Sequence, residues 1–97
     1  MFFRTLAIRG VGGAILWGGL RTAVDVGTWN IARSEPPEAK WTLSARVRRV
    51  DRFQARQRPL VFTAPRFGGG RWFWPIRELN VNLDGTSLVA VLDHPEQ

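Results

Sequence analysis

Residues 41–50 read WTLSARVRRV, and their alternation of apolar and polar side chains decides the fold class. The apolar positions are Trp41, Leu43, Ala45 and Val47, and the positions between them are Thr42, Ser44, Arg46 and Arg48. A period of two sends successive side chains to opposite faces of an extended chain. The segment is therefore predicted to be a half-buried strand with a basic outer face. The alternation slips by one position at Arg48-Arg49, which predicts a bulge or the end of the strand.

The same reasoning predicts more strands towards the C-terminus. They are expected at residues 60–64, 71–83 and 86–92. Pro59 stands just before the first of them, a position that proline tolerates, and the second is expected to carry a bulge near Pro75. A glycine turn, residues 66–71, joins the first to the second, and Asp84-Gly85 is a two-residue hairpin signal before the third. These elements predict an antiparallel meander of four or five strands.

The N-terminal third shows a different pattern. Apolar or small residues recur there at spacings of three or four, at Leu16, Leu20, Val24, Gly27 and Ile31. This spacing is typical of one face of a helix, here over about residues 14–32, after an arm at 1–13. The sequence SEPPE that follows stops a helix and favours an extended connection.

The expected domains are an N-terminal arm and helix (1–33), a proline-rich hinge (34–40) and a small antiparallel β domain (41–97). The predicted fold class is therefore α+β. It consists of a terminal arm and a single helix followed by a small antiparallel β meander or an SH3-like or OB-like barrel.

Composition limits the chemistry that is available to the chain. A chain of 97 residues that is 44% hydrophobic can form one small domain with a compact core. It has no cysteine and a single histidine, His94, so disulfide scaffolds, thiol nucleophiles and Cys- or His-rich metal sites are not expected. The eight carboxylates are scattered, and no serine has a neighbouring base. We expect a protein that is not an enzyme and that binds no cofactor or metal.

Positive charge is concentrated in the first two thirds of the chain. Fourteen basic residues against eight acidic ones give a net charge of +6. The most distinctive series, here called the arginine series, comprises Arg46, Arg48, Arg49, Arg52, Arg56 and Arg58. Guanidinium groups next to aromatic rings such as Phe53 suit single-stranded nucleic acid, which needs cations for phosphates and flat rings for bases. The alternative is a solvated face or one that meets an acidic protein partner.

Aromatic residues supply a second candidate site, RWFWPI at 71–76. Neighbouring side chains of a strand point to opposite faces, so in a sheet covered on one side at least one large ring is exposed. An exposed ring beside an arginine is typical of an interface anchor. The alternative is that both faces of this strand are covered. The candidate protein-interface residues are Arg71, Trp72, Phe73, Trp74, Phe2, Phe3 and Trp17.

Targeting signals are weak. The uncharged run at residues 10–20 has 11 residues, five of them glycine, and is too short to span a bilayer. No small-residue cleavage site follows it before Arg21. We expect a protein that is not secreted and that lies in the cytoplasm of its host cell or within a virion. Contact with a membrane surface through Phe2, Phe3 and Trp17 stays open, without a spanning segment.

These observations favour a non-enzymatic protein–protein interaction or assembly protein. A small basic chain without cysteine and with a terminal arm resembles, in its format alone, small phage and mobile-element proteins. The expected partners are another protein or further copies of the chain, as in the structural components of a virus particle. Two alternatives stay open. One is a basic nucleic-acid-binding module that uses the arginine series, and the other is an inhibitor that docks on another protein's acidic or nucleic-acid-binding surface.

Overall fold

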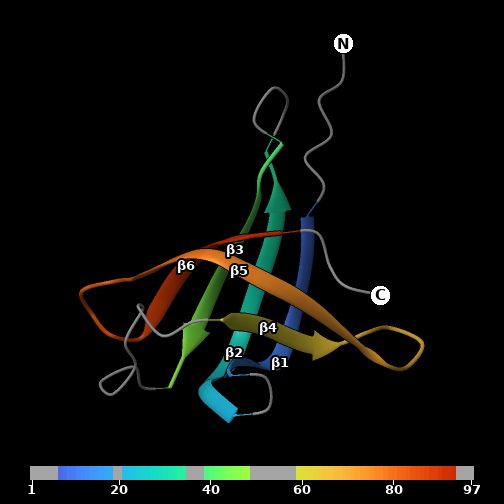
Figure 1. Cartoon of the computed structure of the whole chain (residues 1–97). Helices are drawn as coiled ribbons and strands as arrows, with labels where there is room; N and C mark the ends of the chain where they lie inside the picture. The colour runs from blue at the N-terminus through green and yellow to red at the C-terminus, as the bar shows by residue number, and fades with distance from the viewer. Residues whose placement is uncertain (1–6, 19–20, 35–38, 49–58, 94–97) are drawn as a thin grey trace.

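The chain folds into a closed antiparallel barrel of six strands. The computed structural model describes residues 7–18, 21–34, 39–48 and 59–93 (Figure 1). The strands are β1 (Ala7–Trp17), β2 (Arg21–Arg33), β3 (Trp41–Val47), β4 (Leu60–Pro65), β5 (Arg71–Val81) and β6 (Ser87–Leu92). Around the barrel they follow the order β1-β2-β3-β6-β5-β4, and β4 pairs with β1 to close it. Within the described ranges no helix has the length and apolar character needed to cross a membrane.

The α+β prediction is wrong, because β1 and β2 occupy the segment that was expected to be helical. The buried side chains of β2 are Val24, Val26, Trp29 and Ile31. The pairing of β2 with β3 shifts register between Val26 and Trp29, so an extra residue is inserted into an otherwise alternating strand. The bulge makes the buried positions of β2 depart from strict alternation. Of the residues read as one helical face, Val24 and Ile31 are buried, whereas Gly27 is exposed. The predicted barrel is confirmed, but it includes the N-terminal segment.

The strands predicted in the C-terminal half are confirmed, but the predicted meander is wrong at its first step, because β3 pairs with β6 and β4 pairs with β1. Buried side chains lie at Leu43, Ala45 and Val47 of β3 and at every second residue of β4 and β6. The bulge in β5 falls between Ile76 and Glu78. The prediction that this strand extends to Leu83 is wrong, since β5 ends at Val81 and the Leu83 side chain is fully exposed.

The β5–β6 hairpin closes at the predicted Asp84-Gly85 turn. The N–H of Gly85 donates to the carbonyl of Asn82 at 2.9 Å. The N–H of Thr86 donates to a carboxylate oxygen of Asp84 at 2.9 Å. That backbone hydrogen bond holds the pKa of the Asp84 carboxyl below its ordinary value of 3.8. A short polar side chain thus fixes the turn.

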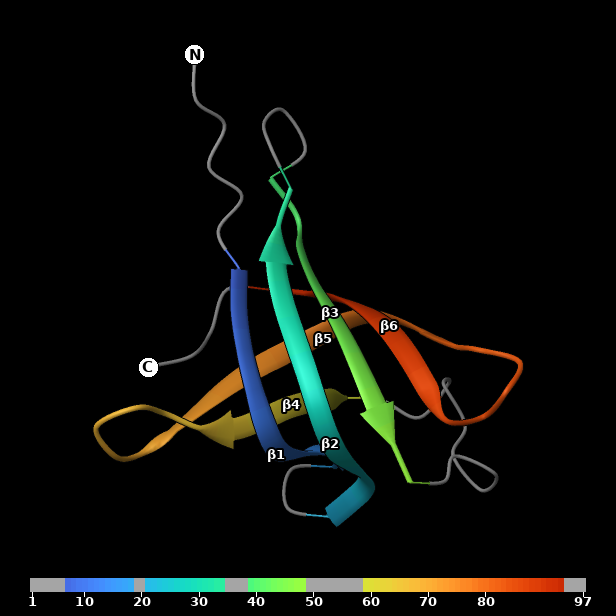
Figure 2. The same cartoon turned by 180° about the vertical axis from the view of Figure 1, so that it is seen from behind.

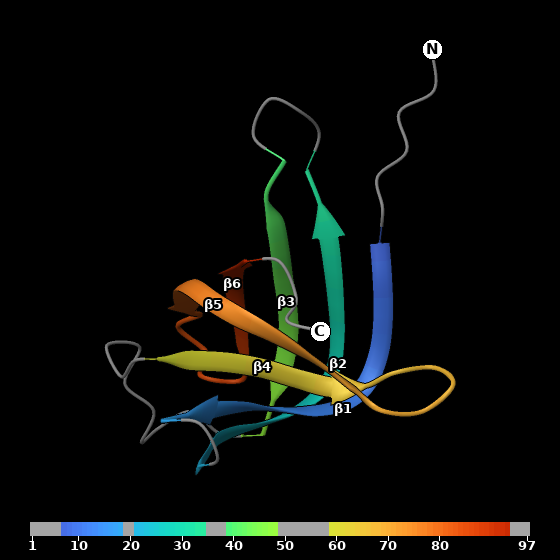
Figure 3. The same cartoon turned by 45° about the vertical axis from the view of Figure 1, so that its right-hand side comes forward.

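β1 bends sharply in its middle, and this bend creates the most unusual surface of the barrel. Its first half, Ala7–Val11, pairs with β2 alone, whereas Ala14–Trp17 pairs with both β2 and β4. Gly12 lies between the halves with φ +83°, a conformation that side chains with a Cβ rarely adopt. Figure 3 shows the two halves of β1 running in different directions. The first half of β1 therefore does not pair with β4 and forms an edge of the sheet.

The core fills the barrel with apolar side chains from all six strands. Phe62, Ile15, Ile31, Leu43 and Leu88 are the largest side chains with essentially no exposure. At one end of the barrel the aromatic rings meet, with Trp29 and Phe62 edge to face at 5.4 Å between centroids.

Candidate docking surface

The first half of β1 presents an unpaired strand edge. We call residues Ala7–Val11 the edge segment. Its register partners in β2 run from Ala32 to Thr28, and no described strand pairs with its other side. In Figure 2 the edge segment lies at the outer border of the sheet. Alternate residues of an antiparallel edge direct both N–H and C=O away from the partner strand, so the edge segment offers backbone hydrogen bonds to an additional strand.

A pocket opens beside this edge. It lies in the corner between the edge segment and the β4–β5 hairpin, whose glycine turn projects past β1 (Figure 3). We call it the corner pocket. Its volume is about 230 Å³, and its lining comprises residues 8–11, Trp29, residues 65–67 and Trp72. The corner pocket therefore joins a free backbone edge to an aromatic hollow.

The indole of Trp29 forms the inner wall of the corner pocket and is itself 6% exposed. Its Nε1–H donates to the carbonyl of Gly12 at 3.0 Å. The ring passes so close to β1 that a Cβ on Gly10 would lie 2.2 Å from a ring carbon. Glycine at position 10 is thus what allows the indole to rest against the strand. The ring is fixed by a hydrogen bond on one side and by Phe62 on the other.

The opposite wall comes from the β4–β5 hairpin. Trp72 is half-buried and contacts Trp74 edge to face at 6.0 Å between centroids. The guanidinium carbon of Arg66 lies 5.7 Å from the centroid of the Trp72 ring, a cation–π contact. Phe67, at the tip of the glycine turn, is fully exposed. Val11, across the pocket on β1, is 76% exposed. Two apolar side chains thus face solvent beside an aromatic pocket.

The corner pocket is positively charged. Arg9 and Arg66 are among its lining residues, and none of the described carboxylates is. In the described parts of the chain neither arginine forms an ion pair; the arginine with a carboxylate partner is Arg77, which binds Asp93. No cluster of three potential metal ligands occurs among the described residues. Guanidinium, indole and phenyl groups bind and stack, and they supply no nucleophile or general base.

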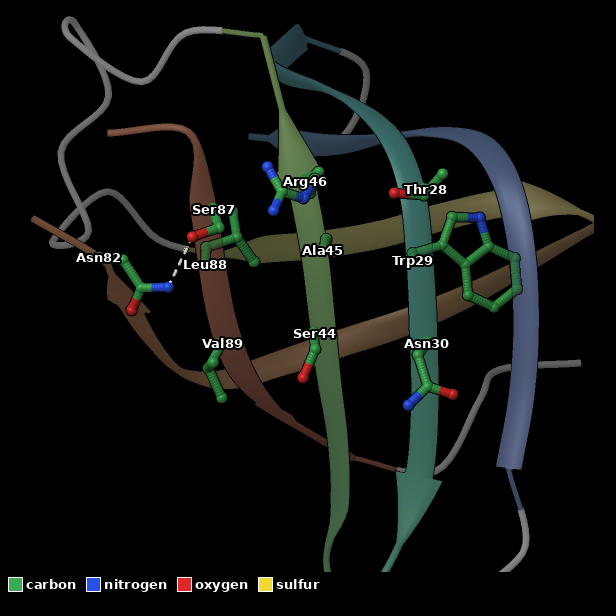
Figure 4. A pocket seen from close by; sticks show the side chains of 10 residues that line it. All are labelled: Thr28, Trp29, Asn30, Ser44, Ala45, Arg46, Asn82, Ser87, Leu88 and Val89. Atoms are coloured by element: carbon green, nitrogen blue, oxygen red, sulfur yellow. Dashed lines mark hydrogen bonds between the residues drawn. The ribbon is translucent and has the colours of Figure 1, made fainter. Parts of the chain in front are cut away.

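A second, more open hollow lies on the outer face of β2, β3 and β6 (Figure 4). Its volume is about 410 Å³ and its side chains are mainly polar, among them Thr28, Asn30, Ser44, Arg46 and Ser87. Figure 4 shows Arg46 between the other two strands, with Ser44 farther along β3. Asn30 has a buried Oδ1 with no hydrogen-bond partner among the described residues.

Part of the arginine series lies on this outer face. Arg46 and Arg48 are exposed on it, whereas Arg49, Arg52, Arg56 and Arg58 lie outside the described residues, as does Phe53. Among the described residues that line this hollow, Trp29 is the aromatic one, and its side chain is buried. Trp41, at the start of β3, contacts Trp74 at 5.3 Å between centroids and carries Arg33 over its ring. Trp41 is therefore packed against the core and does not lie on this outer face.

The predicted interface residues divide between the two faces of β5. Trp74 is buried, Trp72 faces inwards at the corner pocket, and Phe73 faces outwards with 39% exposure. Arg71 is exposed, and its Nε–H donates to the Thr63 hydroxyl at 3.1 Å.

The remaining interface predictions concern the N-terminal region. Trp17 is half-buried at the other end of β1, with Arg21 5.9 Å from its ring centroid. Phe2 and Phe3 lie outside the described residues. The predicted interface set is therefore not one continuous patch in the described structure.

Sequence reasoning missed the edge segment, Gly10, Trp29, Arg66 and Phe67. A usable signal was present in RFGGG at 66–70, because a large apolar side chain at the tip of a glycine turn has no core to enter. The contribution of Trp29 carried no comparable signal, since it depends on the register between β1 and β2.

Comparisons of the chain with protein-family models, with curated proteins and with solved structures gave no match.

Proposed function

We propose that this chain is a non-enzymatic docking protein that binds an extended segment of a partner protein at the corner pocket. The observation that carries the proposal is the unpaired edge segment next to an aromatic pocket. In binding by strand addition, main-chain hydrogen bonds to a free edge supply affinity, and pockets for alternate side chains supply specificity. The edge segment supplies the free strand edge, and its residues 8–11 also line the corner pocket.

The size of the corner pocket supports a side chain as its ligand. Sites for small molecules usually enclose about 300–1,000 Å³. The corner pocket, at about 230 Å³, is smaller and is lined in part by the edge segment. It suits one large apolar side chain of a strand that pairs with the edge segment. Exposed Phe67 then covers that side chain from the hairpin.

Assembly through such contacts fits a component of a larger particle. The edge segment and the corner pocket together form a small binding site, which a flexible segment of a neighbouring subunit could occupy. The prediction that the particle is a virus, and the prediction of location in the cytoplasm or a virion, stay predictions.

Phe67→Ser tests the proposed function with a close control. We expect peptides selected from a random display library on the full chain to bind Phe67→Ser at least about tenfold more weakly, as for an interface anchor worth more than 1.4 kcal/mol. Leu83→Ser is the control, because Leu83 is equally exposed at the tip of the other hairpin. Hydrogen exchange should show that the peptides protect the amides of Ala7–Val11.

Peptides that bind both variants equally and leave those amides unprotected would contradict docking at the corner pocket. Both substitutions replace fully exposed side chains, so the folded state should survive in each. Thermal unfolding of the two variants verifies this before any affinity is compared.

The outer face of β2, β3 and β6 supports a second candidate function, binding of nucleic acid. Arg46 stands there among hydroxyl and amide side chains, with no carboxylate in the hollow's lining. We expect Arg46→Glu to weaken any binding of single-stranded nucleic acid and to reduce the slope of log K against log salt by about 0.7, the value for one phosphate contact.

Arg33→Glu is the matched control for this measurement, since it changes the net charge equally at the far end of β2. Equal losses in both variants would indicate a general effect of charge and would remove the outer face as a specific site. Filter binding across a salt series measures both quantities.

A further inference from the structure

The chemistry of the docked segment can be narrowed further, on the premise that the proposed function is right. The two faces of the edge segment differ. Ile8 and Gly10 are half-buried, whereas Arg9 between them is exposed, and all three contribute to the lining of the corner pocket. Cross-strand neighbours in a sheet point to the same face. A residue of an added strand opposite Ile8 or Gly10 therefore points towards the corner pocket, and its immediate neighbour points to the side of Arg9.

Arg66 places a second positive charge at the rim of the corner pocket. Its guanidinium lies 5.7 Å from the centroid of Trp72, so the charge is held beside the pocket wall. The planar guanidinium keeps its N–H groups available for a carboxylate while its face contacts the ring. Since no carboxylate is found among the described residues that line the pocket, we expect a bound segment to supply the negative charge.

Charge also argues against a second copy of this chain as the occupant. The chain carries +6, and antiparallel pairing of two edge segments over their full length would place the two Arg9 side chains opposite each other. Like charges opposite each other destabilise a strand pair. An uncharged apolar strand would gain the pocket contact and would leave both arginines without a partner.

We propose that the corner pocket recognises an acidic extended segment in which an aspartate or glutamate directly adjoins a large apolar residue. The apolar side chain enters the corner pocket between Trp29 and Trp72. The adjoining carboxylate pairs with Arg9, and a further carboxylate of the segment pairs with Arg66. Charge-assisted hydrogen bonds between guanidinium and carboxylate make this pairing directional.

The test begins with an unbiased peptide selection on the full chain. We expect the selected peptides to carry an acidic residue next to a large apolar one, and we expect their affinity to fall about tenfold in Arg9→Glu and in Arg66→Glu. A peptide whose acidic residue is replaced by lysine should bind Arg9→Glu better than it binds the wild type. Arg33→Glu should leave the affinity for the original peptide within about twofold.

The outcomes separate this inference from the function on which it rests. Peptides that protect the edge segment, carry no acidic preference and bind Arg9→Glu as tightly as the wild type would overturn the inference and leave docking intact. A selection that returns no peptide bound at the corner pocket would overturn both. Enrichment of acidic peptides that bind elsewhere, with Ala7–Val11 unprotected, would overturn both as well.

Discussion

Trp29→Ala is expected to lower the free energy of unfolding by about 3–5 kcal/mol, the range for removal of a large aromatic side chain from a core. Trp29 is 6% exposed, and its ring packs edge to face on Phe62. The substitution also leaves the carbonyl of Gly12 without its indole donor. Domains of this size have total stabilities of about 5–15 kcal/mol, so the loss is a large share of the whole.

Urea denaturation followed by circular dichroism measures this loss. Trp29→Phe is the informative companion, because it keeps an aromatic ring and removes only the Nε1–H donor and part of the buried area. We expect it to cost clearly less than the alanine variant. A loss below about 1 kcal/mol in Trp29→Ala would show that the indole does not occupy the wall of the corner pocket.

The C-terminal half could be predicted from sequence because its signals are local. In β3 the alternation of Leu43, Ala45 and Val47 with polar residues is uninterrupted, and all three side chains are buried. The Asp84-Gly85 turn is fixed by groups within three residues of each other. The alternation of apolar and polar residues and the residue preferences of a turn each involve only a few neighbouring positions. Both can therefore be recognised in one amino-acid sequence.

The N-terminal half could not be predicted in the same way, because two non-local features determine it. The bulge in β2 between Val26 and Trp29 changes the apparent period, and only pairing with β3 reveals it as a strand irregularity. Gly10 lies in the segment that was predicted to be an arm, residues 1–13. The space above Gly10 is instead filled by an indole from 19 positions further along the chain.

In the candidate site, too, the local features could be predicted from sequence and the non-local ones could not. Opposite orientations for neighbouring aromatic residues were predicted from alternation, and Phe73 does point away from Trp72 and Trp74. The corner pocket depends on where β1 separates from β4, which is a property of barrel closure. The side of a strand to which a residue points can therefore be predicted from sequence. The contact between the edge segment and the β4–β5 hairpin cannot, because it depends on how the whole sheet closes.

Gly10→Ala carries the second large expected effect, a loss of about 1–3 kcal/mol in the free energy of unfolding, as for overpacking of a well-filled site. The added Cβ would lie 2.2 Å from one ring carbon of Trp29 and 2.6 Å from another, distances that require the indole to move. The backbone at this position does not itself demand glycine, since Gly10 is not among the glycines with positive φ. The expected cost therefore comes from the ring alone.

A double-mutant cycle with Trp29→Ala isolates that cost. Once the indole is removed, Gly10→Ala should be neutral or stabilising by up to about 1 kcal/mol, because alanine suits a strand better than glycine. Gly27→Ala is the matched control in the neighbouring strand, where the added Cβ would meet only the Arg46 carbonyl at an ordinary 3.5 Å. Equal effects of Gly10→Ala with and without the indole would mean that the ring does not rest on β1. The inner wall of the corner pocket would then have to be assigned to another side chain.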